Sequence, residues 1–171
     1  MLYKNIENII NAISEITGYL SAVAIFCASL LLTYEVVFRY VFNTPTIWEI
    51  EASVFLLLFS AFVGVSFVLK NDACINIDII KSKLSVKTQM LLDTVTSIVA
   101  FLFCVAMTYK GWPMWWESYD LGWKSESLWA PPLWIPYFFL PLGFTLLSAQ
   151  YIVKILQYIR KYKRYNQKLQ S

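Results

Sequence analysis

The chain has no histidine and little charge: only 15% of its 171 residues are charged, whereas 58% are hydrophobic. Without histidine, bis-histidine ligation of haem is excluded. The three cysteines (Cys27, Cys74 and Cys104) have neither metal-ligand spacing nor positions suited to a disulfide, and no glycine-rich phosphate loop or paired nucleophile and base is present. We therefore expect no enzyme activity, no cofactor and no metal site.

The sequence does have long uncharged runs. Four segments lack charge for about the 17 to 25 residues that a membrane-spanning helix needs, although the third is the shortest. They are Thr17–Tyr34, Ala52–Leu69, Thr94–Tyr109 and Ala130–Val153. We predict an all-α integral membrane protein with four transmembrane helices in a single domain, 1–171, and approximate spans 17–42, 47–70, 88–112 and 131–156. Acidic residues precede the first run and no small-residue cleavage site follows it, so we expect it to stay in the mature chain.

The distribution of charge predicts the orientation. Most basic residues lie before the first span, between the second and third, or after the fourth, so the positive-inside rule places both termini and the middle loop in the cytoplasm. The basic C-terminal tail follows a spanning helix directly, and we expect it to face anionic membrane lipids, with no nucleic acid as partner. All seven tryptophans fall on the opposite side: Trp48, Trp112, Trp115, Trp116, Trp123, Trp129 and Trp134.

Two further segments are expected at the cytoplasmic surface. Apolar residues recur at helical spacing from Leu2 to Ile16, which predicts an N-terminal amphipathic segment along the inner leaflet. The loop 71–86 mixes isoleucines with charged residues, which predicts an interfacial cytoplasmic segment. Asp93, near the inner boundary of the third span, is expected to be solvated or paired with Lys87 or another loop lysine.

The first two spans are joined by a short charged hairpin, Glu35 to Glu51. Glu35 and Arg39 are four residues apart, which places them on one helix face with the acid first. The sequence 43–45 (Asn-Thr-Pro) ends the first helix, and Thr46 with Glu49 fits a capping box for the second. Glu49 and Glu51 then lie in the first turn, where they could also reach Arg39.

Small residues form stripes on both helices of this hairpin. The first span carries Ser21, Ala24, Ala28 and Leu31 on the face that ends at Glu35, and the second carries Ser53, Ser60 and Gly64. Small residues allow close helix approach in lipid, where apolar burial no longer discriminates. We predict that these stripes face protein, with Ser60 and Gly64 as a helix contact or a coincidental pair.

The second pair of spans encloses an outer loop. We expect the third span to leave the membrane at Gly111-Trp112-Pro113 and residues 115–128 to form a loop in which Glu117, Asp120 and Glu126 offer a docking surface. The fourth span is expected to begin at 130–132 (Ala-Pro-Pro) and to bend at Pro136, Pro141 and Gly143.

Glu35 allows several interpretations. An intramembrane carboxylate suggests a proton or cation site, which would suit a self-contained small proton-coupled exporter. Arg39 one turn away argues against this, because a permanent cation favours the ionised carboxylate. We favour helix locking or contact with a partner subunit, and a scaffold for another membrane assembly remains a third hypothesis.

An ordered set of motifs resembles the small permease subunit of tripartite ATP-independent periplasmic (TRAP) transporters, the DctQ-like family. The first part is Glu35-x-x-x-Arg39-Tyr40-x-Phe42-Asn43 followed by Trp48-x-x-Glu51. The rest is Ile75-x-Ile77-Asp78 and Pro132-x-Trp134-x-x-Tyr137-x-x-x-Pro141-x-Gly143-Phe144. The sequence 71–74 (Asn-Asp-Ala-Cys) lacks the glycine and histidine usual in the family.

The resemblance implies a multi-pass subunit of the bacterial inner membrane that catalyses nothing itself. Its expected partners are a large twelve-span-class permease subunit, which carries the Na⁺ and substrate sites, and a periplasmic substrate-binding protein. The binding protein would deliver an organic acid such as a C4-dicarboxylate or sialic acid. The small subunit would brace the large one while the latter moves its substrate-carrying part.

Overall fold

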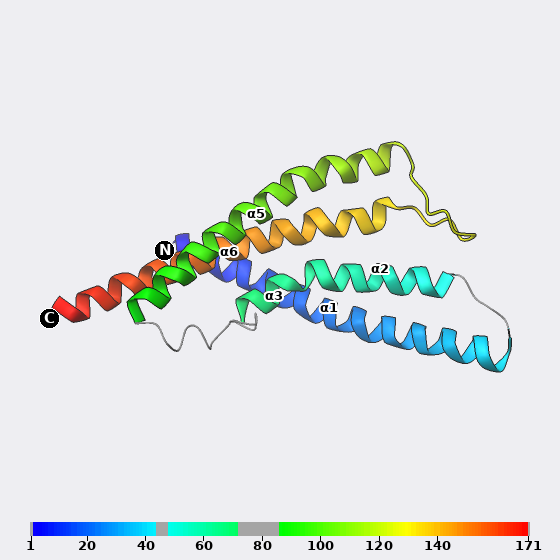
Figure 1. Ribbon diagram of the computed structural model, residues 1–171, viewed down its shortest axis with the longest axis horizontal. Helices are drawn as coiled ribbons and strands as arrows, with labels where there is room; N and C mark the ends of the chain where they lie inside the picture. The colour runs from blue at the N-terminus through cyan, green and yellow to red at the C-terminus, as the bar shows by residue number, and fades with distance from the viewer. Residues whose placement is uncertain (1, 44–47, 72–85, 171) are drawn as a thin grey trace.

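The computed structural model describes residues 2–43, 48–71 and 86–170, and regular structure within these ranges is almost entirely helical (Figure 1). One isolated bridge joins Lys124 and Pro132. The helices are α1 (Leu2–Val41), α2 (Trp48–Val63), α3 (Val65–Lys70), α5 (Val86–Asp120) and α6 (Trp134–Gln170).

Four helical segments in the described ranges are long and apolar enough to cross a membrane, which confirms the predicted all-helical class with four such helices. They are Ile6–Val41, Trp48–Lys70, Thr88–Asp120 and Trp134–Tyr162, the second combining α2 and α3. Figure 1 shows the start of α1 and the end of α6 toward one end of the molecule, whereas the end of α1, the start of α2 and the α5–α6 connection lie toward the other. We call the latter the outer end; the cytoplasmic placement of the termini stays a prediction.

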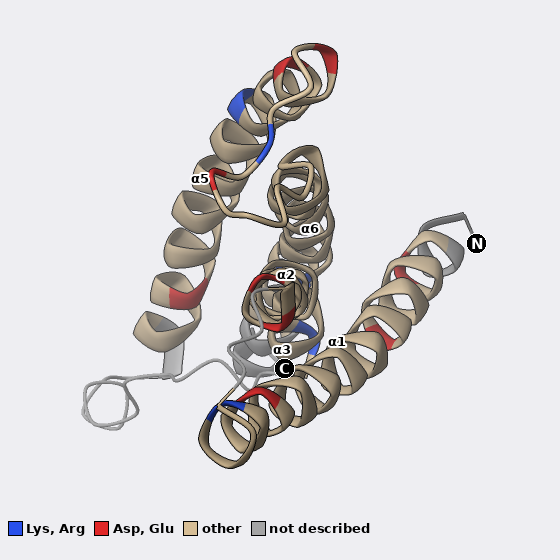
Figure 2. Ribbon diagram, turned by 90° about the vertical axis from the view of Figure 1, so that its right-hand side faces the viewer, with Lys and Arg blue, Asp and Glu red and all other residues tan. Residues whose placement is uncertain are grey.

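Helix α6 is the central element of the bundle. It packs against α5 on one side and against α1, α2 and α3 on the other, and in Figure 2 it lies between α5 and α1. At Gly143, where α6 meets α2, an added Cβ would lie 2.3 Å from the backbone oxygen of Phe62. Only glycine permits this approach, so Gly143 sets the spacing between α2 and α6.

The outer ends of α5 and α6 differ from the sequence expectation. We expected a loop from Trp115, but α5 continues through Pro113 to Asp120. Ring contacts explain the extension: the Trp115 ring centroid lies 5.4 Å from that of Phe138, and Tyr119 lies 5.9 Å from Trp134. These contacts hold the last turns of α5 against α6.

Helix α6 begins at Trp134, later than the expected 130–132. Ala130 has a positive φ of 46°, a left-handed conformation that does not belong to a helix. Pro136 therefore falls in the first turn, where proline is tolerated, and Pro141 is the proline inside the helix.

The N-terminal segment continues into the first span without a break, because α1 is one helix from Leu2 to Val41. Its apolar side chains Ile6, Ile9 and Ile16 are exposed. Location of this segment along the inner leaflet stays a prediction. The capping box at Thr46, Cys74 and most of the interfacial loop 71–86 lie outside the described residues.

Candidate helix-locking and partner-contact sites

The charged pair of the first span lies at the outer end of α1. Glu35 is buried, with 5% of its surface exposed, and it forms an ion pair with Arg39 one turn later. The Arg39 side chain is 49% exposed. The pair therefore neutralises a buried carboxylate while leaving half of the arginine side chain on the surface.

The facing end of α2 holds two acids, the buried Glu49 and the half-buried Glu51; among the described residues, Arg39 forms its ion pair with Glu35 and with neither of them. Glu49 is 1% exposed and Ser53 is fully buried, and in the described part of the chain neither Glu49 Oε2 nor Ser53 Oγ has a hydrogen-bond partner. Glu51 Oε1 accepts a hydrogen bond of 3.1 Å from Ser125 Oγ in the α5–α6 connection. This hydrogen bond links α2 to the connection that leads into α6. Trp48, at the start of α2, is exposed.

The small residues of the hairpin lie between its helices. Ala28 is fully buried, and Ser21 and Ser60 are nearly so. A Cβ added at Gly64 would lie 2.8 Å from Ser21 Oγ on α1. The glycine therefore faces the first helix at close range, as a small-residue contact requires.

A chain of polar side chains ties the N-terminal half of α1 to the rest of the bundle. Ser14 Oγ donates to Gln150 Oε1 on α6 at 3.1 Å, and Gln150 Nε2 donates to Asn11 Oδ1 at 3.1 Å. Lys70 Nζ, at the end of α3, donates to the Asn11 backbone oxygen at 3.1 Å and to Glu15 Oε2 at 2.9 Å. Three helices thus meet at Asn11.

Closer to the termini, the contact continues between Glu7 and α6. Gln157 Nε2 donates to Glu7 Oε1 at 2.7 Å, and Arg160 Nη1 lies 3.7 Å from Glu7 Oε2. Together these hydrogen bonds and ion pairs form one polar network, which includes Glu7, Asn11, Ser14, Glu15, Lys70, Gln150 and Gln157. Sequence reasoning missed it, although a glutamine inside an apolar span was the available signal, since polar side chains in lipid need partners.

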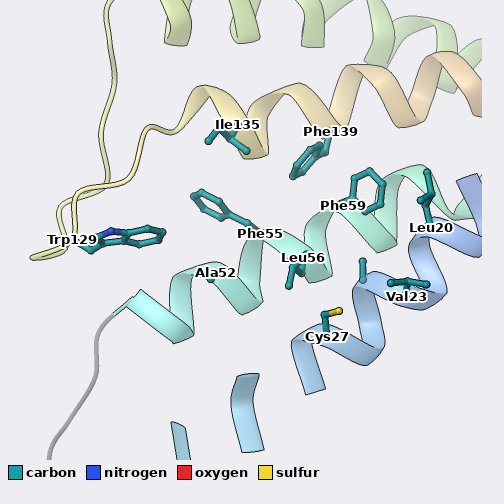
Figure 3. Close-up of a pocket in the computed structure, with 11 residues that line it drawn as sticks. Leu20, Val23, Cys27, Ala52, Phe55, Leu56, Phe59, Trp129, Ile135 and Phe139 are labelled. Carbon is teal, nitrogen blue, oxygen red and sulfur yellow. The ribbon is translucent and has the colours of Figure 1, made fainter. Parts of the chain in front are cut away.

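A cavity of about 680 Å³ lies between α1, α2 and α6 (Figure 3). Its walls are aliphatic and aromatic side chains and one thiol, and the indole of Trp129 lies at its outer end. Representative lining residues are Leu20, Cys27, Ala52, Phe59, Trp129 and Phe139. Such walls offer no group that would bind a hydrophilic solute.

The three outer acids are all exposed. Glu117 and Asp120 lie in the last turns of α5, and Glu126 lies in the connection to α6.

Asp93 lies partly buried at the opposite end of α5. In the described ranges, no group of three or more histidine, cysteine, aspartate or glutamate residues is arranged to hold a metal ion.

Comparison with known proteins finds a matching protein family and a relative within it. Residues 28–161 match the model of the family described as tripartite ATP-independent periplasmic transporters, DctQ component. The chain is 26% identical over 150 residues to the C4-dicarboxylate TRAP transporter small permease protein DctQ of Vibrio cholerae serotype O1, a match covering 73% of this chain and 63% of that relative. The family match covers well over half of the chain and includes both the Glu35–Arg39 pair and Gln150, so this protein belongs to the DctQ component family of TRAP transporters.

Proposed function

We propose that this chain is a non-catalytic brace for a large permease subunit of the bacterial inner membrane. The complex would take up an organic acid, such as a C4-dicarboxylate or sialic acid, by Na⁺-coupled transport. A periplasmic binding protein would deliver the acid. Membership of the DctQ component family supports a role within a transporter, and the C4-dicarboxylate in the name of the Vibrio relative makes that class the first substrate to test.

The observation that carries the proposal is the use of polar groups to lock helices. Gln150 joins α6 to Asn11 and Ser14, and Lys70 joins α3 to the same turn of α1. Ser14 and Gln150 are buried, and a buried polar group is costly if it is left without a partner. A bundle held in this way suits a static support against which another subunit moves.

The same geometry argues against a self-contained carrier. The cavity between α1, α2 and α6 is apolar, and Glu35 is paired with Arg39. A dicarboxylate would need cationic or hydrogen-bonding groups along its path to replace its water. The proposed exporter based on Glu35 is therefore the weaker hypothesis.

Reconstitution in liposomes tests the proposal. We expect no uptake of radiolabelled succinate with this chain alone, and Na⁺-dependent uptake when a large permease subunit and a binding protein from the same source are added. We also expect the chain to copurify with the large subunit. Uptake by liposomes that contain only this chain would refute the bracing function.

The exporter hypothesis has its own test. It requires Glu35→Gln to abolish pH-driven transport by the isolated chain while leaving the helical content intact. If Glu35→Gln instead lowers copurification with the large subunit, the bracing function gains support, because the ion pair then serves assembly.

A further inference from the structure

Two buried acids face each other across the outer end of the α1–α2 hairpin. Gly64 on α2 packs against Ser21 on α1, which fixes the antiparallel register of the two helices. By helical spacing, Glu49 lies on the same face of α2 as Ser60 and Gly64, and Glu35 lies on the same face of α1 as Ser21. The register therefore places Glu35 opposite Glu49. Their burial agrees, because Glu35 is 5% exposed and Glu49 is 1% exposed.

A buried hydroxyl group lies beside Glu49 on the same face of α2. Ser53 follows Glu49 by one helical turn and is fully buried. Hydroxyls elsewhere in the spanning helices donate to the backbone oxygen four residues earlier, as Thr94 does to Met90 at 2.8 Å. Ser53 Oγ makes no such bond, and in the described part of the chain Glu49 Oε2 also lacks a hydrogen-bond partner. Two buried oxygen atoms are thus presented toward α1 at a cost that a ligand would remove.

The charges at this end of the hairpin do not balance. Among the described residues, Arg39 forms its ion pair with Glu35, which leaves the charge of Glu49. The N-terminus of α2 carries a partial positive charge of about half an elementary charge, but the C-terminus of α1 beside it carries an equal negative one. The helix dipoles therefore cancel, and one buried negative charge remains for a counter-ion.

We propose that Glu49, Ser53 and Glu35 bind one monovalent alkali cation between the outer ends of α1 and α2. Carboxylate and hydroxyl oxygens are the ligands that hard cations take in proteins. A single positive charge neutralises Glu49, and a cation held by both helices would clamp the open end of the hairpin. The sequence did not predict this site, because its search for metal ligands was directed at histidine and cysteine.

The alternatives fit less well. A divalent cation takes several carboxylates, and in the described ranges no group of three or more histidine, cysteine, aspartate or glutamate residues is arranged to hold a metal ion. A basic side chain of a partner protein would have to reach Glu49, which is already 99% covered by this chain when only 1% is exposed. A small ion needs no such opening.

Binding of radioactive cations to the purified chain in detergent micelles tests the site. The probes are ²²Na⁺ and ⁸⁶Rb⁺, measured by scintillation proximity, with unlabelled Na⁺, K⁺ or choline as competitors. We expect saturable binding of at least one isotope that an unlabelled alkali cation displaces and choline does not. Absence of saturable binding of both isotopes would overturn the proposal.

Variants of the two α2 ligands locate the ion. Glu49→Gln removes a charged ligand and should lower the affinity about tenfold or more, whereas Ser53→Ala removes a neutral ligand and should lower it about threefold to tenfold. The matched control is Glu51→Gln, which removes the same charge in the same turn. Glu51 accepts a hydrogen bond from Ser125 in the α5–α6 connection, so it faces away from α1 and its loss should change the affinity by about twofold at most. Equal losses in Glu49→Gln and Glu51→Gln would show that general negative charge attracts the ion, and the proposal would be wrong.

Thermal unfolding of the parent chain keeps the test open if a variant does not fold. A ligand that binds only the folded state raises the midpoint of unfolding. At constant ionic strength, the midpoint should therefore be higher in NaCl or KCl than in choline chloride. If the midpoint is equal in all three salts and shifts only with pH, Glu49 holds a proton in place of a cation, which would also overturn the proposal.

Discussion

Ser14 Oγ donates a hydrogen bond to Gln150 Oε1 at 3.1 Å, which joins the first helix to the last across 136 positions of the chain. Both residues are 2% exposed. Gln150 also donates to Asn11, so one amide satisfies two polar groups of α1. Because Ser14 and Gln150 are buried, no solvent replaces this hydrogen bond when it is lost, and the contact therefore fixes the N-terminal half of α1 against α6.

Replacing Gln150 should destabilise the bundle. Gln150→Leu keeps most of the side-chain volume but leaves Ser14 and Asn11 without their partner. Buried hydrogen bonds of this kind contribute modestly in membranes, so we expect a loss of about 1 to 2 kcal/mol in the free energy of unfolding. Equilibrium unfolding in mixed micelles measures it.

The matched control is Gln157→Leu on the same helix. Gln157 also bonds to α1, through Glu7 at 2.7 Å, but its side chain is exposed. Water replaces the lost bond there, and the expected change is below about 0.5 kcal/mol. Equal losses in the two variants would show that burial of Gln150 contributes nothing.

Gly143→Ala should separate α2 from α6. The added Cβ would lie 2.3 Å from the Phe62 backbone oxygen, so the backbone itself must move. Forced overpacking of this kind costs about 1 to 3 kcal/mol. We expect a lower midpoint of thermal unfolding in detergent.

Gly111→Ala is the comparison for Gly143. Its added Cβ would lie 2.9 Å from Leu140 Cδ2, the end of a flexible side chain that can turn away. A smaller loss of stability is therefore expected at Gly111 than at Gly143. The reverse order would contradict the role of Gly143 in setting the spacing.

The sequence was sufficient to predict the four helices, but it was not sufficient to predict the contacts between their polar groups. Uncharged runs of spanning length identify the four helices, because the bilayer imposes that length. The Glu35–Arg39 pair followed from spacing on one helix. Gln150 and Ser14 come together through tertiary packing alone, which helical periodicity does not report.

The end of α5 and the burial of Glu49 were not predicted, for the same reason. Gly111 and Pro113 read locally as the end of a helix, but ring contacts from Trp115 and Tyr119 to α6 carry α5 on to Asp120. Packing between helices outweighed the local preference of proline here. Likewise, the burial of Glu49 depends on how the hairpin packs, which local spacing does not determine.

Arg39→Ala should damage the hairpin more than the loss of one surface charge would. Glu35 would remain buried without its cation, although the half-exposed Arg39 shows that water screens part of the pair. We expect about 1 to 3 kcal/mol of destabilisation and reduced copurification with a large permease subunit. Unfolding and pull-down assays measure the two effects.

The double variant identifies the cause. Adding Glu35→Gln to Arg39→Ala removes the uncompensated charge, so stability should partly return. If the double variant is as unstable as the sum of the single variants, the pair is not coupled. Stability that returns without recovery of copurification would assign Arg39 a direct contact with the partner.

Charge reversal at the outer acids should weaken binding of a periplasmic partner. Glu117, Asp120 and Glu126 are exposed at the outer end, where a soluble protein can reach them. Reversing all three to lysine should lower the association rate and raise the Kd about tenfold or more at low salt, because exposed charges mainly steer encounter. Surface plasmon resonance with the assembled membrane complex measures both quantities.

The control is Lys161→Glu, an exposed charge change at the opposite end of the molecule, which should leave the association rate and the Kd unchanged. Unchanged affinity in the triple variant, with normal insertion, would remove these acids from the docking surface.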